Sequence, residues 1–422
     1  MLLFLLSLVS ADTDKPWSLL GQSGYSGEVE VNRRTGSSLF YWQFNSIGSS
    51  IFQDRRPLIL WLQGGPGCSG EEGMLGERIS PFYVDNEQVP HFNNMTWALH
   101  FHLITVDFPY NTGFSYATVT SDLQNSTVSA TNYLYNFLQI LYSKYPVWFQ
   151  RDFYIFGESY AGHWVPALAY KILTENEGSE LTGVFDLPLK GIGIGDGLFD
   201  AFYQSPYYDF FAFNEGFVNR PEENSMSETE GLINSNIISG NYVAANNYLS
   251  DVEEQFSNFS NGVNLYNVRL FSQENFGDFP GWLNLPSTKS LLNVASNITW
   301  VGCNEDTFNS FSADITQGFI STMMPYVLSN IKVLIYNGQD DFIINTAGVE
   351  NFIANLKWSK TVDFLRSRRS VWNVVGSIAG YVQTYSNLTF VVILKAGHFS
   401  PFDQPYAARD MVSRFILNQG WN

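Results

Sequence analysis

The segment from Phe153 to Pro166 reads FYIFGESYAGHWVP, and it tells more about the fold than any other part of the chain. The apolar run 153–156 predicts a buried strand, and the apolar residues that follow the glycines predict a helix. Residues 157–161 between them follow the pattern G-x-S-x-G, with alanine in the last small position. The segment therefore indicates a nucleophile elbow that exposes Ser159, although a plain glycine-rich turn also fits these letters.

Short apolar runs without polar alternation recur along the chain, as expected for strands buried on both faces of a parallel sheet. They occupy residues 57–62, 102–109, 153–156, 189–194, 332–336 and 390–394. Alternating segments near the start add strands at 27–31 and 38–44, and helical periodicity predicts helices at 127–145 and 407–418. Because strands and helices alternate, the sequence predicts an α/β fold with a mostly parallel central sheet flanked by helices.

The pattern changes between residues 201 and 309, where aromatic, Asn, Ser and Glu residues mix without strand alternation. Helices are expected near 230–235 and 242–258. We therefore expect residues 12–200 and 310–422 to form one core, with 201–309 inserted into it as a lid subdomain.

The charge of the chain restricts its partners. The 422 residues carry a formal net charge of −18, and the pI is near 4.6. Such a surface repels nucleic acid and anionic membranes, so we expect neither as a partner. It suits a protein that works in acid, where many carboxylates are protonated.

The N-terminus indicates export. Residues 1–11 read MLLFLLSLVSA, an apolar run that ends in a small-x-small site and is too short to cross a bilayer, which is typical of a signal peptide. No later segment has roughly 18 uncharged apolar residues, so no membrane span is expected. Five Asn-X-Ser/Thr sequons are consistent with export. These glycosylation candidates are Asn94, Asn125, Asn258, Asn297 and Asn387.

A nucleophilic serine needs a base and an acid that orients this base, and in a nucleophile-elbow fold the acid and then the histidine follow the serine in sequence. Asp340 and Asp341 follow one apolar run directly, and His398 follows another. Both positions lie at the carboxyl ends of predicted strands, where open α/β sheets place their sites. His100 and His102 could hold a metal, but no third ligand is near, so we interpret them as strand residues and expect no metal.

Several motifs together resemble the serine carboxypeptidases, α/β-hydrolase enzymes of lysosomes, vacuoles and secreted fluids. They occur in the order of that family and span residues 17–415. The matching segments are WLQGGPGCS (61–69), DFPYNTGFSY (107–116), GESYAGH (157–163), GIGDGL (193–198), NGQDDF (337–342), AGY (379–381) and GHFSPFDQP (397–405).

The resemblance implies a role for each catalytic residue. Ser159 would be the nucleophile and His398 the general base. The spacing after the preceding glycine favours Asp341 over Asp340 as the acid that orients His398. The oxyanion hole would consist of the backbone N–H groups of Gly65 and Tyr160, one from a glycine-rich loop and one directly after the nucleophile.

The family removes one residue from a free C-terminus and holds the terminal carboxylate with carboxylic acids. The resemblance assigns this carboxylate site to Glu77 and Glu158, with Gln63 in place of a usual asparagine. Two close carboxyl groups share a proton, and this proton is lost as the pH rises, so we expect an acid optimum. Phe399 would line the pocket of the leaving residue. One extra residue after Glu77 and an aspartate at 196, where asparagine is common, depart from the family pattern.

Cys68 and Cys303, the only cysteines, match the positions of a family disulfide. The sequence as a whole predicts a serine carboxypeptidase without a cofactor, which acts on peptide or protein C-termini in a lysosome, a vacuole or a secretion. A homodimer is compatible with the family. The alternatives are an acyltransferase or esterase that uses the same triad, and a non-catalytic stabilising protein of the same fold.

Overall fold

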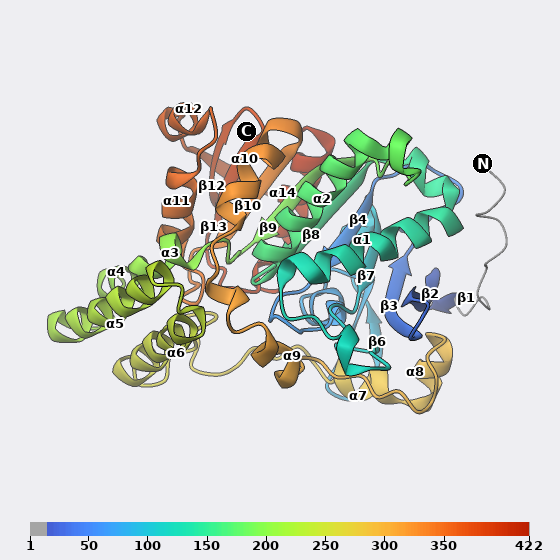
Figure 1. The fold of residues 1–422 in the computed structure, drawn as a ribbon, viewed down its shortest axis with the longest axis horizontal. Helices are drawn as coiled ribbons and strands as arrows, with labels where there is room; N and C mark the ends of the chain where they lie inside the picture. Colours follow the sequence, from blue (N-terminus) through green and yellow to red (C-terminus); the bar gives the residue numbers. More distant parts are fainter. Residues whose placement is uncertain (1–14, 422) are drawn as a thin grey trace.

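The computed structural model describes residues 15–421, so the predicted signal peptide, residues 1–11, lies outside the described residues. Within them, one eleven-stranded sheet runs through the molecule in the order β1-β2-β3-β7-β4-β8-β9-β10-β13-β12-β11 (Figure 1). Its six central strands are parallel to one another. These strands are β4 (Leu58–Leu62), β7 (His102–Val106), β8 (Phe153–Glu158), β9 (Leu189–Gly195), β10 (Lys332–Gly338) and β13 (Leu388–Ile393). The predicted α/β-hydrolase sheet is confirmed.

Antiparallel strands extend the sheet at both sides. On one side lie β1 (Lys15–Leu19), β2 (Gln22–Asn32) and β3 (Ser37–Phe44), of which β2 and β3 contain the two strands expected near the start. On the other side lie β11 (Ser370–Val374) and β12 (Ser377–Tyr385), which the sequence did not predict. A two-residue turn with positive φ at Val375 and Gly376 joins this second pair. A separate hairpin pairs β5 (Phe82–Val84) with β6 (Pro90–Phe92).

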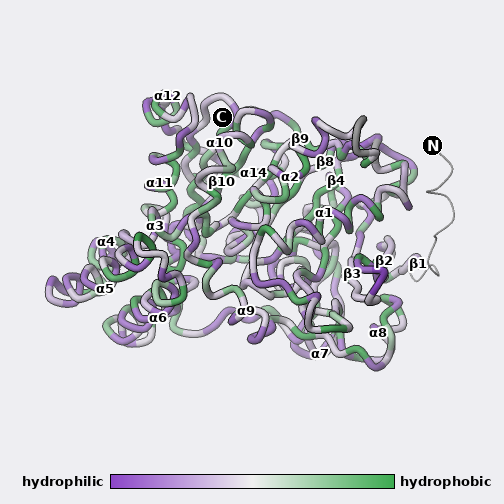
Figure 2. Tube along the Cα trace, in the orientation of Figure 1, coloured by the Kyte–Doolittle hydropathy of each residue, from purple (hydrophilic) through white to green (hydrophobic). Residues whose placement is uncertain are grey.

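Helices bury both faces of the sheet, which explains why its strands are continuously apolar. In β4 the residues Leu58, Leu60 and Leu62 enter one core, and Ile59 and Trp61 enter the other. The first core lies under α1 (Thr127–Lys144), α2 (Ala161–Thr182) and α10 (Ile320–Asn330), and α14 (Pro405–Leu417) covers the opposite face. Figure 2 shows hydrophobic residues gathered along the central strands.

The long segment between β9 and β10 contains further helices. They are α3 (Ala201–Gln204), α4 (Tyr208–Asn214), α5 (Arg220–Ile238), α6 (Tyr242–Phe259), α7 (Phe279–Asn284), α8 (Pro286–Leu291) and α9 (Glu305–Ser310). The pair α5 and α6 projects from the core as an arm, at the left of Figure 1. The helices expected near 230–235 and 242–258 lie within this pair, and α5 starts earlier because Asn219 and Glu222 form a capping box.

Two short helices follow β10. They are α11 (Thr346–Asn355) and α12 (Thr361–Arg366). Another short helix, α13 (Ser400–Asp403), precedes α14. The loops at the carboxyl ends of β4, β8, β9, β10 and β13 meet at one edge of the parallel sheet, where open α/β sheets place their binding sites.

The glycines of β9 leave room for aromatic rings of the neighbouring strands. A Cβ atom at Gly193 would lie 2.1 Å from the ring of Phe156, and one at Gly195 would lie 2.3 Å from the ring of Tyr336. The repeat of glycine at alternate positions therefore allows close packing of the strands that hold the site.

We predict that Gly193→Ala lowers the free energy of unfolding by about 1–3 kcal/mol, because an added methyl group overpacks the sheet. Urea unfolding measures the change. The control is Gly231→Ala in α5, where no heavy atom lies within 4 Å of the added Cβ and a gain of about 0.5–1 kcal/mol is expected. Equal effects of the two substitutions would contradict the prediction.

Candidate active site

Ser159 lies between the end of β8 and the start of α2, with a φ of 62°, in the left-handed region that side chains rarely adopt. The strand-end loop after β9 holds it there, because the N–H of Ser159 donates to the carbonyl of Gly195 (3.0 Å) and its carbonyl accepts from the N–H of Leu198 (2.9 Å). A Cβ atom at Gly64 would lie 2.6 Å from that of Ser159, so the β4 loop packs directly on this turn. The segment is thus a nucleophile elbow rather than a plain turn.

The candidate base and acid form a buried pair. Nδ1 of His398 lies 2.8 Å from Oδ2 of Asp341, and both side chains are almost fully buried. Oδ1 of Asp341 accepts from the N–H of Ile344 (3.2 Å). Because Nδ1 of His398 faces the carboxylate, its Nε2 is left for a reaction partner. Asp340 lies elsewhere, in an ion pair with Arg269 (2.8 Å), so the geometry favours Asp341 as the orienting acid.

Ser159 and His398 line one pocket at the edge of the sheet. Ser159 Oγ has no hydrogen-bond partner among residues 15–421. A hydrogen bond between a nucleophile and its base often forms with good geometry only when substrate binds. The backbone N–H groups of Gly65 and Tyr160 also donate to no acceptor in the described part of the chain. They come from the β4 loop and from the residue after Ser159, as an oxyanion hole requires.

A disulfide and a buried polar cluster fix the β4 loop. Cys68 and Cys303 are bonded, and next to them the N–H of Ser69 donates to the carbonyl of Gly302 (2.7 Å). Ser69 Oγ lies 2.5 Å from a carboxylate oxygen of Glu71 and 2.6 Å from one of Asp107. One hydroxyl proton cannot serve two carboxylates, so one carboxyl is protonated. Burial, together with the charge of Glu71, raises the pKa of Asp107 well above its usual value.

The candidate carboxylate site is a triangle of buried side chains. Nε2 of Gln63 lies 3.4 Å from Oε1 of both Glu77 and Glu158, and Nε1 of Trp61 donates to Oε1 of Gln63 (2.8 Å), which fixes the amide orientation. Burial raises the pKa of Glu77 to about 7. Burial and the charge of Glu77 raise the pKa of Glu158 well above its ordinary value. At acid pH, therefore, at least one of these carboxyl groups is a hydrogen-bond donor.

The extra residue after Glu77 does not displace this carboxyl group. A short π-helical turn, Glu72–Gly76, precedes Glu77, and Arg78 follows it with a φ of 62°. The guanidinium of Arg78 stacks on the rings of Tyr83 (4.5 Å) and Phe402 (5.1 Å). Arg78 therefore has a left-handed backbone directly after the candidate carboxylate site.

Aromatic side chains form the remaining wall of the pocket. Phe399 stacks on Tyr266 (5.3 Å between ring centroids) and meets Phe276 edge to face (5.1 Å). The carboxyl group of Glu72 also lines the pocket, and its pKa is raised to about 7 by burial and by the charges of Glu77 and Glu71. Sequence reasoning missed Tyr266, Phe276 and Glu72, because the first two belong to an irregular stretch between α6 and α7 and no motif marks the third.

Two other histidines, His102 and His163, hydrogen-bond or stack with neighbouring residues of the fold. Nδ1 of His102 accepts from the N–H of Ser46 (3.0 Å) and its Nε2 lies 2.9 Å from Asp54. The interpretation as a strand residue is confirmed for His102, which begins β7, but it is wrong for His100, which lies in the turn that follows the short helical segment Trp97–Leu99. The ring of His163 stacks on Tyr160 in the elbow helix (4.5 Å).

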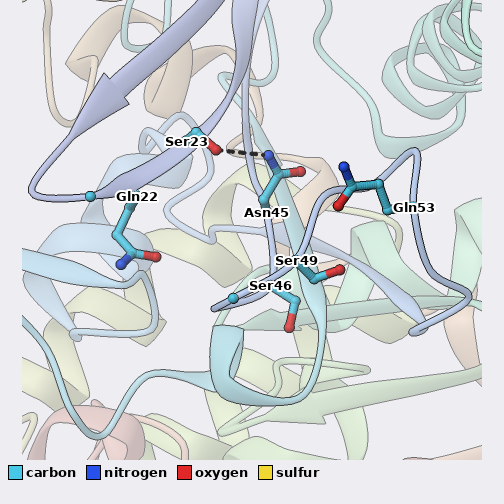
Figure 3. Close-up of a pocket in the computed structure, with 8 residues that line it drawn as sticks. Gln22, Ser23, Asn45, Ser46, Ser49 and Gln53 are labelled. Atoms are coloured by element: carbon cyan, nitrogen blue, oxygen red, sulfur yellow. Dashed lines mark hydrogen bonds between the residues drawn. The ribbon is translucent and has the colours of Figure 1, made fainter.

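A second hollow lies between the start of β2 and the loop that follows β3, and Figure 3 shows its lining. Nδ2 of Asn45 donates to Oγ of Ser23 (3.1 Å), and the other residues drawn are Gly, Ser or Gln. None of these side chains ionises near neutral pH, so this hollow offers no acid–base pair.

Asp196, Asp341 and His398 each present a ligand atom, and these atoms all lie within 4.8 Å of one another. The spacing alone would fit a cation. However, the atoms already have hydrogen-bond partners within the protein: Asp341 with His398, and Asp196 with Gly338 and Ser400.

The parallel sheet, the elbow and the buried acid–histidine pair define an α/β-hydrolase. The crystal structure of a prohormone-processing carboxypeptidase from Saccharomyces cerevisiae matches with a TM-score of 0.83 and 25% identity, over 94% of this chain and 92% of that chain. The serine carboxypeptidase family profile matches residues 15–418. The chain therefore belongs to the serine carboxypeptidase family and is a hydrolase.

Two relatives illustrate the extent of the similarity. Serine carboxypeptidase S10 family member 1 of Dictyostelium discoideum is 35% identical over an alignment of 403 positions, and the match covers 93% of this chain and 94% of that protein. Carboxypeptidase Y of Candida albicans is 34% identical over an alignment of 424 positions, and the match covers 93% of this chain and 72% of that protein.

Two further features of the structure concern membrane-spanning helices and the glycosylation candidates. None of the helices in residues 15–421 is long and apolar enough to cross a bilayer. Asn94, Asn125, Asn258 and Asn297 are exposed, as glycosylation requires. Asn387 is half-buried and its Nδ2 donates to the carbonyl of Leu328 (2.9 Å), so it is the least suited of the five candidates.

The raised pKa of Glu77 links stability to pH. The pKa of a glutamate in an unfolded chain is about 4.3. The pKa of Glu77 in the folded protein is about 7, so the folded state binds the proton more tightly between these pH values. Its contribution to stability is therefore full below the unfolded pKa and is lost as the pH rises toward 7.

We predict that Glu77→Gln flattens this pH dependence, because the amide mimics the protonated acid and cannot ionise. Relative to the wild type, the variant should gain roughly 1–3 kcal/mol in unfolding free energy between pH 4.5 and 8, as measured by urea unfolding. The exposed Glu87→Gln is the matched control. Parallel curves for wild type and Glu77→Gln would contradict the assignment.

Proposed function

We propose that this protein is an acid-favoured serine carboxypeptidase that releases single residues from the C-termini of peptides and proteins. The observation that carries the proposal is the convergence, in one pocket, of Ser159, the His398–Asp341 pair and the buried acids Glu77 and Glu158. The triad supplies a nucleophile, and the acid pair supplies recognition of a free carboxylate.

The geometry supports an acyl-enzyme mechanism. Oγ of Ser159 attacks the carbonyl carbon of the last peptide bond while its proton passes to Nε2 of His398. The negative charge that develops on the carbonyl oxygen is stabilised by the N–H groups of Gly65 and Tyr160. When the intermediate collapses, the C–N bond breaks and His398 gives its proton to the leaving amine. Water then attacks the ester by the same steps in reverse, with His398 again as base, and frees Ser159.

The acid pair accounts for the expected pH preference. A protonated Glu77 or Glu158 donates a hydrogen bond to the terminal carboxylate of the substrate, as does Nε2 of Gln63. As the pH rises through about 7, Glu77 loses its proton, the donor disappears and a negative charge faces the substrate carboxylate. The affinity for a free C-terminus should therefore fall as the pH rises, and the aromatic wall at Phe399 would contact the leaving side chain.

The carboxylate site also ranks the alternatives. An acyltransferase or esterase would use the triad but would not require the acid pair, and a binding protein would need neither. Buried acids are costly to retain without a use, which favours the carboxypeptidase. Exposed sequons and the N-terminal sequence favour the secretory pathway, with a lysosome, a vacuole or a secretion as the destination.

We predict that an N-blocked dipeptide with a free C-terminus is hydrolysed at least tenfold faster, in kcat/KM, than its C-terminal amide at pH 5, because only the free acid engages the acid pair. The advantage should decrease toward pH 8, mainly through a higher KM for the free acid. Release of the C-terminal residue, measured from pH 4 to 8, tests both statements.

Ser159→Ala should reduce the rate by several orders of magnitude for both substrates, since it removes the nucleophile. Equal turnover of acid and amide would retain Ser159 and reject the acid pair as the carboxylate site. No turnover of either substrate by a folded wild type would reject the proposed activity.

A further inference from the structure

One buried carboxyl group next to the triad has no role in the mechanism above. Asp196 directly follows β9, and its side chain contacts Gly338 at the end of β10 and Ser400 in the segment after β13. Its side chain is fully buried. One oxygen, Oδ1, accepts from the N–H of Gly338 (2.7 Å), and the other, Oδ2, lies 3.2 Å from Oγ of Ser400.

Asp196 lies against the candidate catalytic pair. An oxygen of Asp196, an oxygen of Asp341 and a ring nitrogen of His398 lie within 4.8 Å of one another. Two carboxylates this close in a buried site repel each other strongly, and a single imidazolium cannot neutralise both. The carboxyl groups of Asp196 and Asp341 therefore hold one proton between them, as other buried carboxylate pairs do.

The hydrogen bonds indicate which carboxyl group carries this proton. Asp341 must be a carboxylate to accept from Nδ1 of His398, and its second oxygen already accepts from Ile344. Oδ1 of Asp196 is committed to the N–H of Gly338, which leaves Oδ2 to carry the proton. The hydroxyl of Ser400, 3.2 Å from Oδ2, also lies 3.1 Å from the carbonyl oxygen of Gly397, which can accept its proton. The side chains of Asp196 and Asp341 are within hydrogen-bonding reach of each other, so a proton on Asp196 can be donated to Asp341.

We propose that Asp196 is a positioning residue that stays protonated while the enzyme is active and donates a hydrogen bond to Asp341, so that Asp341 stays oriented toward His398. The proposal rests on the triad of the proposed function. When Asp196 ionises, Asp341 loses a donor and gains a repulsive neighbour, and the orientation of His398 is lost.

The surroundings favour the protonated form of Asp196. Burial raises its pKa well above the ordinary value and the charge of Asp341 adds to this, whereas the hydrogen bonds from Gly338 and Ser400 oppose it. Glu158 at the end of β8 and the hydroxyl of Tyr336 on β10 also interact electrostatically with Asp196.

More distant ionisable groups act through the same cluster. Glu253 of α6 faces Asp341 and His398, and Glu77 faces Glu158. Each of these groups is neutral or negative, and His398 is the one group among those named that can become a cation. Ionisation of Asp196 thus adds charge to a cluster that is already acidic.

The test measures the reactivity of Ser159 without a peptide substrate. The second-order rate of labelling by phenylmethanesulfonyl fluoride, from pH 5 to 9, reports the triad but not the carboxylate site. The wild-type rate should rise as His398 loses its proton and then fall at alkaline pH as Asp196 ionises. Asp196→Asn should label within about twofold of wild type at the maximum and should lack the alkaline fall, with a rate at least fivefold above wild type at pH 9.

The asparagine variant suits this test because its Oδ1 can accept from Gly338 while Nδ2 permanently donates to Asp341. Asp196→Ser, whose hydroxyl can also donate and does not titrate, is the second variant in case the first does not fold, and it should also lack the alkaline fall. Asp200→Asn is the matched control, since Asp200 is a buried helix cap in the same loop, and it should keep the wild-type profile.

Three results would overturn the proposal. They are an alkaline fall that persists in a folded Asp196 variant, a uniform loss of rate at every pH in these variants, and a wild-type rate that stays level up to pH 9. Failure of the wild type to label at all would reject the triad and this proposal together. Labelling without peptide cleavage would reject the carboxypeptidase activity and leave the role of Asp196 intact.

Discussion

The left-handed backbone of Ser159 is the constraint on which the rest of the site depends. A serine at positive φ costs on the order of 1–3 kcal/mol and persists only where its surroundings enforce it. Here two backbone hydrogen bonds from the β9 loop and the close approach of Gly64 enforce it. Because the same loops present Gly65 and Asp196, the strain that exposes Ser159 also gathers the proposed oxyanion donors and the acid cluster around it.

The buried carboxyl groups form the second theme of the molecule. Glu77 and Glu158 form the proposed carboxylate site, Asp107 contacts Ser69 of the β4 loop and Asp196 lies beside Asp341 and His398. In all four, burial is the largest cause of a raised pKa, so the same physical effect acts on the proposed carboxylate site, on the β4 loop and on the surroundings of the His398–Asp341 pair. A low pH therefore favours the protonated form of all four carboxyl groups.

Much of this arrangement is predictable from the sequence, because apolar runs mark the parallel strands and chemical residues follow directly at their ends. Ser159, Asp341 and His398 were identifiable in this way. Tyr266 and Phe276 were not, since they reach the pocket from an irregular stretch whose path depends on packing against the core. The proximity of Asp196 to Asp341 depends on the adjacency of β9 and β10 in the sheet, which no local pattern encodes.

The position of the disulfide has a consequence for the covalent continuity of the molecule. Cys68 precedes the elbow, and Cys303 follows almost all of the segment inserted between β9 and β10. Any single cut of the backbone between these two cysteines leaves two polypeptides that remain bonded to each other. A cut in the α5–α6 arm would separate β1–β9 from β10–β13, yet the adjacent strands β9 and β10 would still hold the two polypeptides in one sheet. Nicking there yields a two-chain protein rather than two fragments that diffuse apart.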